Sequence, residues 1–119
     1  MGKLTDGRFE TQQVAVTEAL NCNIAAATEL VRMRFFTQTL IKEVRAAILT
    51  AGLTTTAGFT VFKNTSSIGK VTVGVGTAGA IVDASLADTT FANTDDLVVK
   101  NITSDANLDA RLLVGYSEL

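Results

Sequence analysis

The sequence predicts an all-β fold: an antiparallel β-sandwich, jelly-roll-like, with an extended N-terminal arm. Three observations predict it. Residues 57–74 form a β-hairpin pattern, because two runs of β-branched and aromatic residues flank a polar loop at 64–67. Other strand-like runs recur about every ten residues, separated by Gly, Asn, Asp, Thr and Ser. The run at 108–119 alternates most regularly of all.

Length and composition predict one domain with an associating surface. We divide the 119 residues into a flexible or docking arm over 1–7 and a single sandwich domain over 8–119. Charged residues make up only 18% of the chain, and the mean hydropathy is +0.32. Since no apolar run approaches the roughly 18 residues that span a bilayer, we expect no membrane partner. The apolar, weakly charged surface indicates a subunit interface instead.

The N-terminal third has three segments with different patterns. Residues 8–18 are interpreted as one extended strand with widely spaced apolar residues. Residues 21–28 are mostly small, and propensity alone would make them helical. Residues 29–36 alternate between a wholly apolar set and a set that carries Arg32 and Arg34. That alternation is typical of a half-buried strand.

Residues 39–51 fit either a helix or a strand. As a helix, the apolar residues form a stripe at a spacing of three to four, and Gly52 caps its C-terminus. As a strand, the apolar residues share one face, which Lys42 interrupts. The β-rich neighbourhood favours the strand.

The second half contains two clearer strands and two uncertain segments. Residues 80–87 form a short segment of uncertain type, and Phe91 is placed in a loop over 88–93. Residues 97–102 alternate weakly, and residues 108–119 form the closing strand.

The residue types exclude the commonest catalytic and metal chemistry. The chain has no histidine and one cysteine, Cys22. A nucleophilic cysteine normally has a histidine beside it, and a structural zinc site needs four ligands of these types. We therefore expect no enzyme, no cofactor and no metal, with Cys22 a core filler or a neutral surface thiol. One cysteine also fits folding in a reducing cytoplasm.

Two motifs suggest ligands and are better explained as turns. Residues 74–79 spell GxGxxG after a strand, as in dinucleotide-binding units. The acids at the required distance, Asp95 and Asp96, precede the next strand instead of ending it, so a loop between antiparallel strands explains the match. Residues 105–109 resemble a calcium loop but lack its glycine and distal glutamate. Turn capping by Asp and Asn explains them.

The charge balance argues against a nucleic-acid partner. The net charge is −2 and the isoelectric point is near 5.0, whereas nucleic-acid surfaces cluster Lys and Arg. The ten basic residues are scattered along this chain.

Residues from about 54 to 119 carry three phrases that resemble a known class of protein: FTVFKNTSSIGKVTVG, DTTFANTDDLVVKNITSD and LLVGYSEL. They are similar to phrases in the head decoration (cement) proteins of tailed bacteriophages, small β-sandwiches of jelly-roll type. The resemblance implies a non-enzymatic virion protein that stabilises a phage capsid by bridging its subunits. It further implies the major capsid protein as partner, a homotrimer, and a place on the capsid surface of the virion. No functional residue carries over from the family.

Within this hypothesis, the arm and one strand are the expected docking elements. The candidate capsid-docking residues are Lys3, Arg8, Phe9, Arg32 and Arg34. The two arginines fit an exposed strand face equally well. The alternative function is a tail- or fibre-associated β-sandwich module that binds carbohydrate or a receptor. Such a module needs an exposed aromatic or Asp/Asn cluster at one end, and the chain has no Trp and one Tyr.

Overall fold

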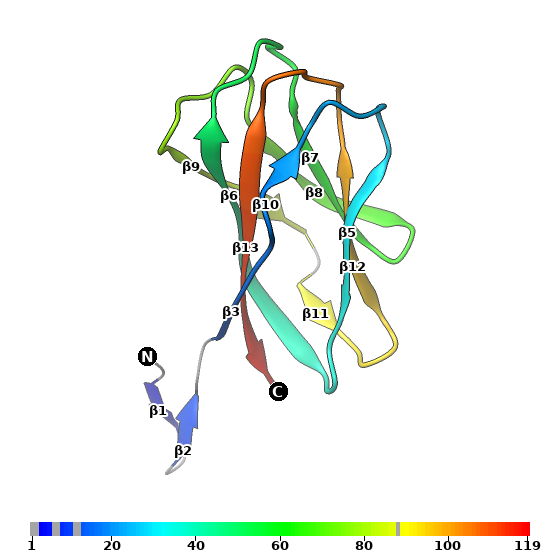
Figure 1. Cartoon of the computed structure of the whole chain (residues 1–119). Coiled ribbons are helices and arrows are strands. Elements are labelled where there is room, and N and C mark those ends of the chain that lie inside the picture. The colour runs from blue at the N-terminus through cyan, green and yellow to red at the C-terminus, as the bar shows by residue number, and fades with distance from the viewer. Residues whose placement is uncertain (1–2, 6–7, 11–12, 88) are drawn as a thin grey trace.

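The computed structural model describes residues 3–5, 8–10, 13–87 and 89–119, and within these ranges it contains strands and no helix. The strands are β1 (Lys3–Thr5), β2 (Arg8–Glu10), β3 (Gln13–Val16), β4 (Leu20–Asn21), β5 (Glu29–Arg34), β6 (Thr39–Thr50), β7 (Gly58–Lys63), β8 (Ser66–Thr72), β9 (Ile81–Asp83), β10 (Ser85–Leu86), β11 (Thr90–Phe91), β12 (Asp96–Asn101) and β13 (Asp109–Glu118). Their ladders are antiparallel, so the predicted all-β sandwich is confirmed (Figure 1).

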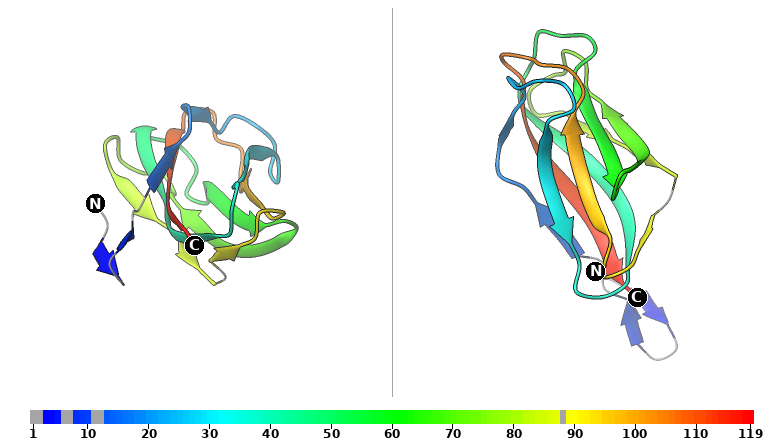
Figure 2. Two further views of the ribbon diagram at one scale, coloured as in Figure 1. Left: turned by 90° about the horizontal axis from the view of Figure 1, so that it is seen from below. Right: turned by 90° about the vertical axis from the view of Figure 1, so that its right-hand side faces the viewer.

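Two curved sheets enclose the core. One has the order β11–β6–β13–β3, with β9 also paired to β6 and β4 to β13. The other has the order β10–β8–β7–β12–β5. Seen end-on, the two sheets curve around a common interior (Figure 2).

The strand pairs are nested along the chain. β3 and β4 pair with β13, β5 pairs with β12, β6 pairs with β9 and β11, and β7 pairs with β8. The ladders β6–β13 and β7–β12 then join these pairs into sheets. The finer jelly-roll assignment stays a prediction.

The two sides of the sandwich are built differently. On one side the chain passes from one sheet to the other at Ala84, between β9 and β10. The N–H of Ala84 donates to the Val44 carbonyl (2.8 Å) and that of Ala87 to the Ile68 carbonyl (2.8 Å), so this segment closes the side. On the other side, β5 and the β3–β4 segment each have a partner strand on one edge alone, among the strands described.

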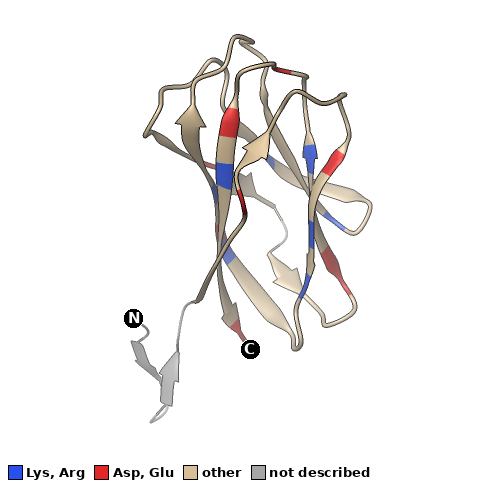
Figure 3. Cartoon of the chain, in the orientation of Figure 1, with Lys and Arg blue, Asp and Glu red and all other residues tan. Residues whose placement is uncertain are grey.

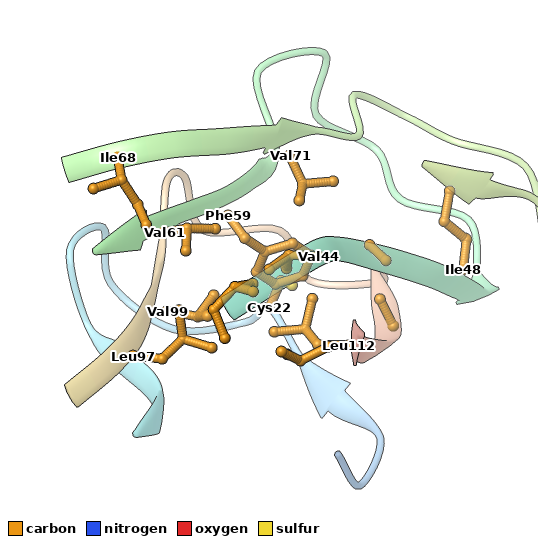
Figure 4. Close-up of a cluster of buried hydrophobic side chains, with 14 of the residues drawn as sticks. Cys22, Val44, Ile48, Phe59, Val61, Ile68, Val71, Leu97, Val99 and Leu112 are labelled. Carbon is orange, nitrogen blue, oxygen red and sulfur yellow. The ribbon is translucent and has the colours of Figure 1, made fainter. Parts of the chain in front are cut away.

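The core lies between the sheets and is made of aliphatic and aromatic side chains (Figure 4). Its largest fully buried members are Phe59 and Phe91, with Ile and Leu residues around them. The placement of Phe91 in a loop was wrong. Phe91 lies in β11, is completely buried, and meets the Phe35 ring edge-on at 6.3 Å between ring centres.

A β-bulge at Lys42 resolves the ambiguous segment, which is strand β6 as favoured. Ile41 pairs with Tyr116 and Glu43 with Gly115, so Lys42 is an extra residue on β6. The bulge shifts the phase of the alternation. Ile41 and Val44 therefore both face the core, although strict alternation would expose one of them.

Residues 21–28 are not helical, contrary to their propensity. They form β4 and an irregular loop in which Ala27 has a φ of 63°, outside the right-handed helical region. The backbone of Asn101 binds the Ala27 N–H (2.7 Å) and the Thr28 carbonyl (2.9 Å). Tertiary hydrogen bonds thus replace the bonds that a helix would have made.

Residues 8–18 do not form one strand. β2 pairs with β1 as a separate hairpin, whereas β3 pairs with β13. The division between arm and domain at residue 7 stays a prediction. The turn after β7 is tighter than expected, because β8 begins at Ser66. Asn64 has the left-handed conformation expected of it, with a φ of 58°.

Deleting Lys42 should destabilise the protein by at least about 2 kcal/mol, because the deletion removes the bulge and turns the buried Ile41 side chain outward. Urea unfolding measures the change. The control is Lys42→Ala, which keeps the extra residue and should stay within about 0.5 kcal/mol of wild type. Equal stability of the deletion and the control would show that the phase of β6 is not set by this bulge.

Candidate functional site

Arg32 and Arg34 lie together on the outer face of β5 and bind the same carboxylate. Arg32 Nη1 is 2.6 Å from Asp96 Oδ2, and Arg34 Nε is 2.7 Å from Asp96 Oδ1. Arg32 also pairs with Glu29 (Nη2–Oε1 2.7 Å). Hydrogen bonds from Arg34 first and Arg32 second lower the pKa of Asp96, and the bond from Arg32 lowers the pKa of Glu29. Figure 3 shows charges of both signs along β5 and β12.

This cluster covers an apolar residue on the outer face of the sheet. Val98 pairs with Arg32 on one side and with Phe62 on the other, and it is fully buried although its neighbours Leu97 and Val99 point into the core. Lys100 Nζ lies 4.7 Å from the centre of the Phe62 ring. Long side chains therefore shield this face with their stems.

The sequence-predicted docking residues divide into two groups. The structure brings Arg32 and Arg34 together, with about half of each side chain exposed and each paired to an acid. The side chains of Lys3, Arg8 and Phe9 lie outside what the structure describes, which gives only the backbone pairing of β1 with β2. Capsid docking by these five residues stays a prediction.

Asp105 anchors the loops at the end of the sandwich that is remote from the C-terminus. Its carboxylate accepts four backbone N–H bonds, from Leu53 and Thr54 (both 2.8 Å), Asn107 (3.0 Å) and Leu108 (3.1 Å). Burial acts to raise the pKa of Asp105, but the four donors together outweigh it and lower the pKa to about 2. The expected turn capping is confirmed.

Asn101 and Cys22 complete the packing at this end. The side-chain amide of Asn101 donates to the carbonyls of Ile24 (2.9 Å), Thr103 (3.2 Å) and Cys22 (3.4 Å). Cys22 is fully buried, which confirms the core-filler interpretation. Burial first, and then the nearby charges of Asp105 and Asp109, raise its pKa to about 11. A thiol with that pKa is protonated at neutral pH and is a poor nucleophile.

The GxGxxG segment is a loop, as interpreted, although the two strands that it joins lie in different sheets. It connects β8 to β9, and all three glycines have positive φ, between 65° and 87°. Two backbone hydrogen bonds hold its ends. The Gly74 N–H donates to the Ala57 carbonyl (2.9 Å), and the Gly79 N–H donates to the Ile48 carbonyl (2.8 Å). The loop therefore lacks the helix that a pyrophosphate site requires.

Two kinds of site do not occur in the described part of the chain. The described side chains include no group of three or more His, Cys, Asp or Glu placed to hold a metal ion. Nor do the described ranges contain a helix of the length and apolarity needed to cross a membrane.

An apolar end of the sandwich was missed by sequence reasoning. Phe36 is 94% exposed in the turn between β5 and β6, and Leu119 is 64% exposed. The Leu119 N–H donates to the Gln38 carbonyl (2.8 Å), which brings the C-terminus to this turn (Figure 1). In the alternating pattern of residues 29–36, Phe36 falls in the set that carries Arg32 and Arg34. That position was the sequence signal that its side chain faces solvent.

No protein-family model matches this chain, and neither a curated protein nor a solved structure is significantly similar to it.

The Asp105 carboxylate should make stability depend on pH between about 4 and 2. Its folded pKa lies below the unfolded value, so its contribution is complete above about pH 4 and is lost as the pH falls through the folded pKa of about 2. Asp105→Asn should flatten this dependence and cost about 2–3 kcal/mol at neutral pH, since an amide NH₂ would face backbone donors.

Thermal melts measured from about pH 2 to about pH 7 test this effect, because this range covers both the folded and the unfolded pKa of Asp105. Asp109→Asn is the matched control, because Asp109 accepts a hydrogen bond from the exposed Asn21 amide (2.7 Å) and not from the loop backbone that Asp105 holds. If the two variants show the same profile, the buried Asp105 anchor is not the group that titrates.

Proposed function

We propose that this chain is a non-enzymatic virion structural protein that decorates a tailed-phage capsid and stabilises it by bridging capsid subunits. The observation that carries the proposal is the apolar end, where Phe36 and Leu119 project beside the turn between β5 and β6. Phe36 adds nothing to the core from this position. An exposed aromatic side chain is typical of residues that become the centre of a protein–protein contact.

The strand order supports the jelly-roll part of the proposal. The first strand of the sandwich, β3, pairs with the last, β13, and β5 pairs with β12, the strand before β13. A long hairpin that is rolled up gives this nested pairing. The three sequence stretches that resemble phage head decoration proteins lie within this arrangement, from β7 to β13.

The physical mechanism needs no catalytic group. A protein that binds the assembled capsid but not its separated subunits stabilises the assembly by mass action. Full burial of one Phe side chain contributes about 1.5–3 kcal/mol to such a contact. Repeated at every joint of a shell, contacts of this size oppose expansion and breakage.

Phe36→Ser should weaken capsid binding about tenfold or more, because a loss of about 1.4 kcal/mol corresponds to a factor of ten. The measurement is co-sedimentation with capsids assembled from the major capsid protein of the same genome. Leu53→Ser is the matched control, since Leu53 is 67% exposed in the loop that follows β6, whereas Phe36 lies in the turn before β6. No binding by the wild-type chain, or an equal loss in both variants, would overturn the proposed docking end.

Removing residues 1–10 should also weaken capsid binding, because Lys3, Arg8 and Phe9 are lost, while the thermal melt of the sandwich should change little. Co-sedimentation and circular dichroism on the same sample measure both properties. Unchanged capsid binding would refute a docking role for the arm and leave Phe36 as the tested contact.

A further inference from the structure

One side of the sandwich leaves part of its core uncovered. β3 and β5 border this side, and among the strands described neither has a partner on its outer edge (Figure 2). Val31 and Met33 on β5 lie opposite core residues of β12 and face inward, yet both are only partly buried. Ile68 and Val71 on β8, where β10 pairs with that strand, are at most 7% exposed. The sheet therefore covers its inward side chains at β8 and not at β5.

The hydrogen bonds of β12 show which of its residues bond to β5. The Asn101 N–H donates to the Thr28 carbonyl just before β5 (2.9 Å), whereas the Ile102 N–H donates to the Gly58 carbonyl on β7 (3.0 Å). Because the backbone groups of a strand alternate between its two edges, the odd-numbered residues of β12 bond to β5.

The outer edge of β5 presents the backbone groups of Arg32 and Arg34. Val31 and Met33 pair with odd-numbered residues of β12, so their N–H and carbonyl groups lie within the ladder. Arg32 and Arg34 alternate with them and direct these groups to the outer edge, where no described strand pairs. The chemical group that matches a row of open N–H and carbonyl groups is the backbone of another extended segment.

The opposite side of the sandwich shows what kind of segment closes such a gap. Residues 81–87 cross it, pairing with β6 through β9 and with β8 through β10. Val82, Ala84 and Leu86 alternate along this segment and pack against the core, whereas Asp83 between them is exposed. An extended segment with apolar residues at every second position is therefore the form that fits between the edges of these two sheets.

The arginines of β5 favour an acidic residue on the segment. In the closing segment, Asp83 lies opposite Arg45 of β6, with Arg45 Nε 2.8 Å from Asp83 Oδ1. Arg32 and Arg34 have the corresponding place on β5, and their side chains are 50% and 58% exposed. Asp96, to which both bind, lies on β12, on the far side of β5 from the outer edge. An acid on an added strand would face the two arginines from the open side, and opposite charges across a strand pair are favourable.

Two other occupants fit this edge poorly. A second copy of β5, paired antiparallel about a two-fold axis, would bring Arg32 and Arg34 against the same arginines, and like charges directly opposite are destabilising. In the N-terminal arm, Leu4 and Phe9 are five residues apart, so an extended strand would turn them to opposite faces. The edge therefore matches a segment of a different protein.

We infer that β5 accepts an extended segment of a partner protein as an added strand, with apolar residues at alternate positions and an acidic residue between them beside Arg32 and Arg34. This inference deepens the proposed function by naming how a segment of the capsid protein would be held, and it rests on that function for the identity of the partner. Phe36 lies two residues beyond β5, so a segment along this edge continues towards the exposed end proposed for docking.

A tethered copy of the closing segment tests the edge. The probe is residues 80–87 of this chain, AIVDASLA, joined in front of the full chain by a flexible Gly/Ser linker, which gives an effective concentration of about 1 mM. Amide exchange at Arg32 and Arg34 should slow about tenfold, because their N–H groups gain acceptors. Exchange is measured residue by residue by NMR. Val31 and Met33 are the internal control, since their N–H groups are already within the ladder.

The matched control carries Asp83→Lys in the added copy alone. This change places a like charge beside Arg32 and Arg34, so the added protection of the two arginine amides should be lost. Unchanged exchange at both arginines with the original segment, or the same protection from both segments, would overturn the inference.

Arg34→Pro and Arg34→Ala separate this inference from the proposed function. Both variants lose the guanidinium, but proline also removes an N–H of the outer edge, and neither loses a ladder bond. Capsid co-sedimentation should be about fivefold weaker for Arg34→Pro than for Arg34→Ala, the effect of about one hydrogen bond. Equal capsid binding by the two variants overturns the capsid segment as the occupant and supports the function. A chain that the tethered segment protects but that binds no capsids supports the strand-accepting edge and overturns the function.

Discussion

The ladder between β6 and β13 runs from the pair Thr39–Glu118 to the pair Thr50–Asp109, and four other strands attach to its two outer edges. Both of its irregularities add a residue on β6, at Lys42 and at Leu49. The stretch between these bulges faces regular partners on β13, so the same register places apolar side chains of both strands in the core. A slip of one residue would turn every one of them outward. The core and the outer face of this sheet thus depend on one alignment.

At one end of the sandwich, buried polar side chains hold segments together that the ladder does not reach. The chain has no proline to restrict its loops and a single cysteine, which allows no internal cross-link. Asp105 and Asn101 instead hold loops that are distant in sequence through hydrogen bonds to their backbones. An anionic carboxylate with four N–H donors is a strong anchor, because charge-assisted hydrogen bonds are stronger than neutral ones.

Alternation of side chains predicted the strands because a half-buried strand has period two, and this was sufficient for residues 29–36 and 108–119. The phase shift at Lys42 was visible as an interruption but not as a bulge, since a bulge is defined by the partner strand. Phe91 has too few neighbours in β11 to show a period, and the loop at 21–28 is held by Asn101 from far along the chain. The pairing of Arg32 and Arg34 with Asp96 is likewise a tertiary contact without a local signal. The sequence could predict that Phe36 faces solvent, because Phe36 alternates in step with Arg32 and Arg34.

The nested pairing has a consequence for synthesis on the ribosome. β13 follows every other strand in the chain, yet it lies inside its sheet, between β6 and β3. At about 5–20 residues per second, the chain therefore spends several seconds with β3 and β6 made but not joined. Contacts between such distant segments also make folding slow. This sheet therefore cannot close, and its side of the core cannot be covered, until β13 has been made.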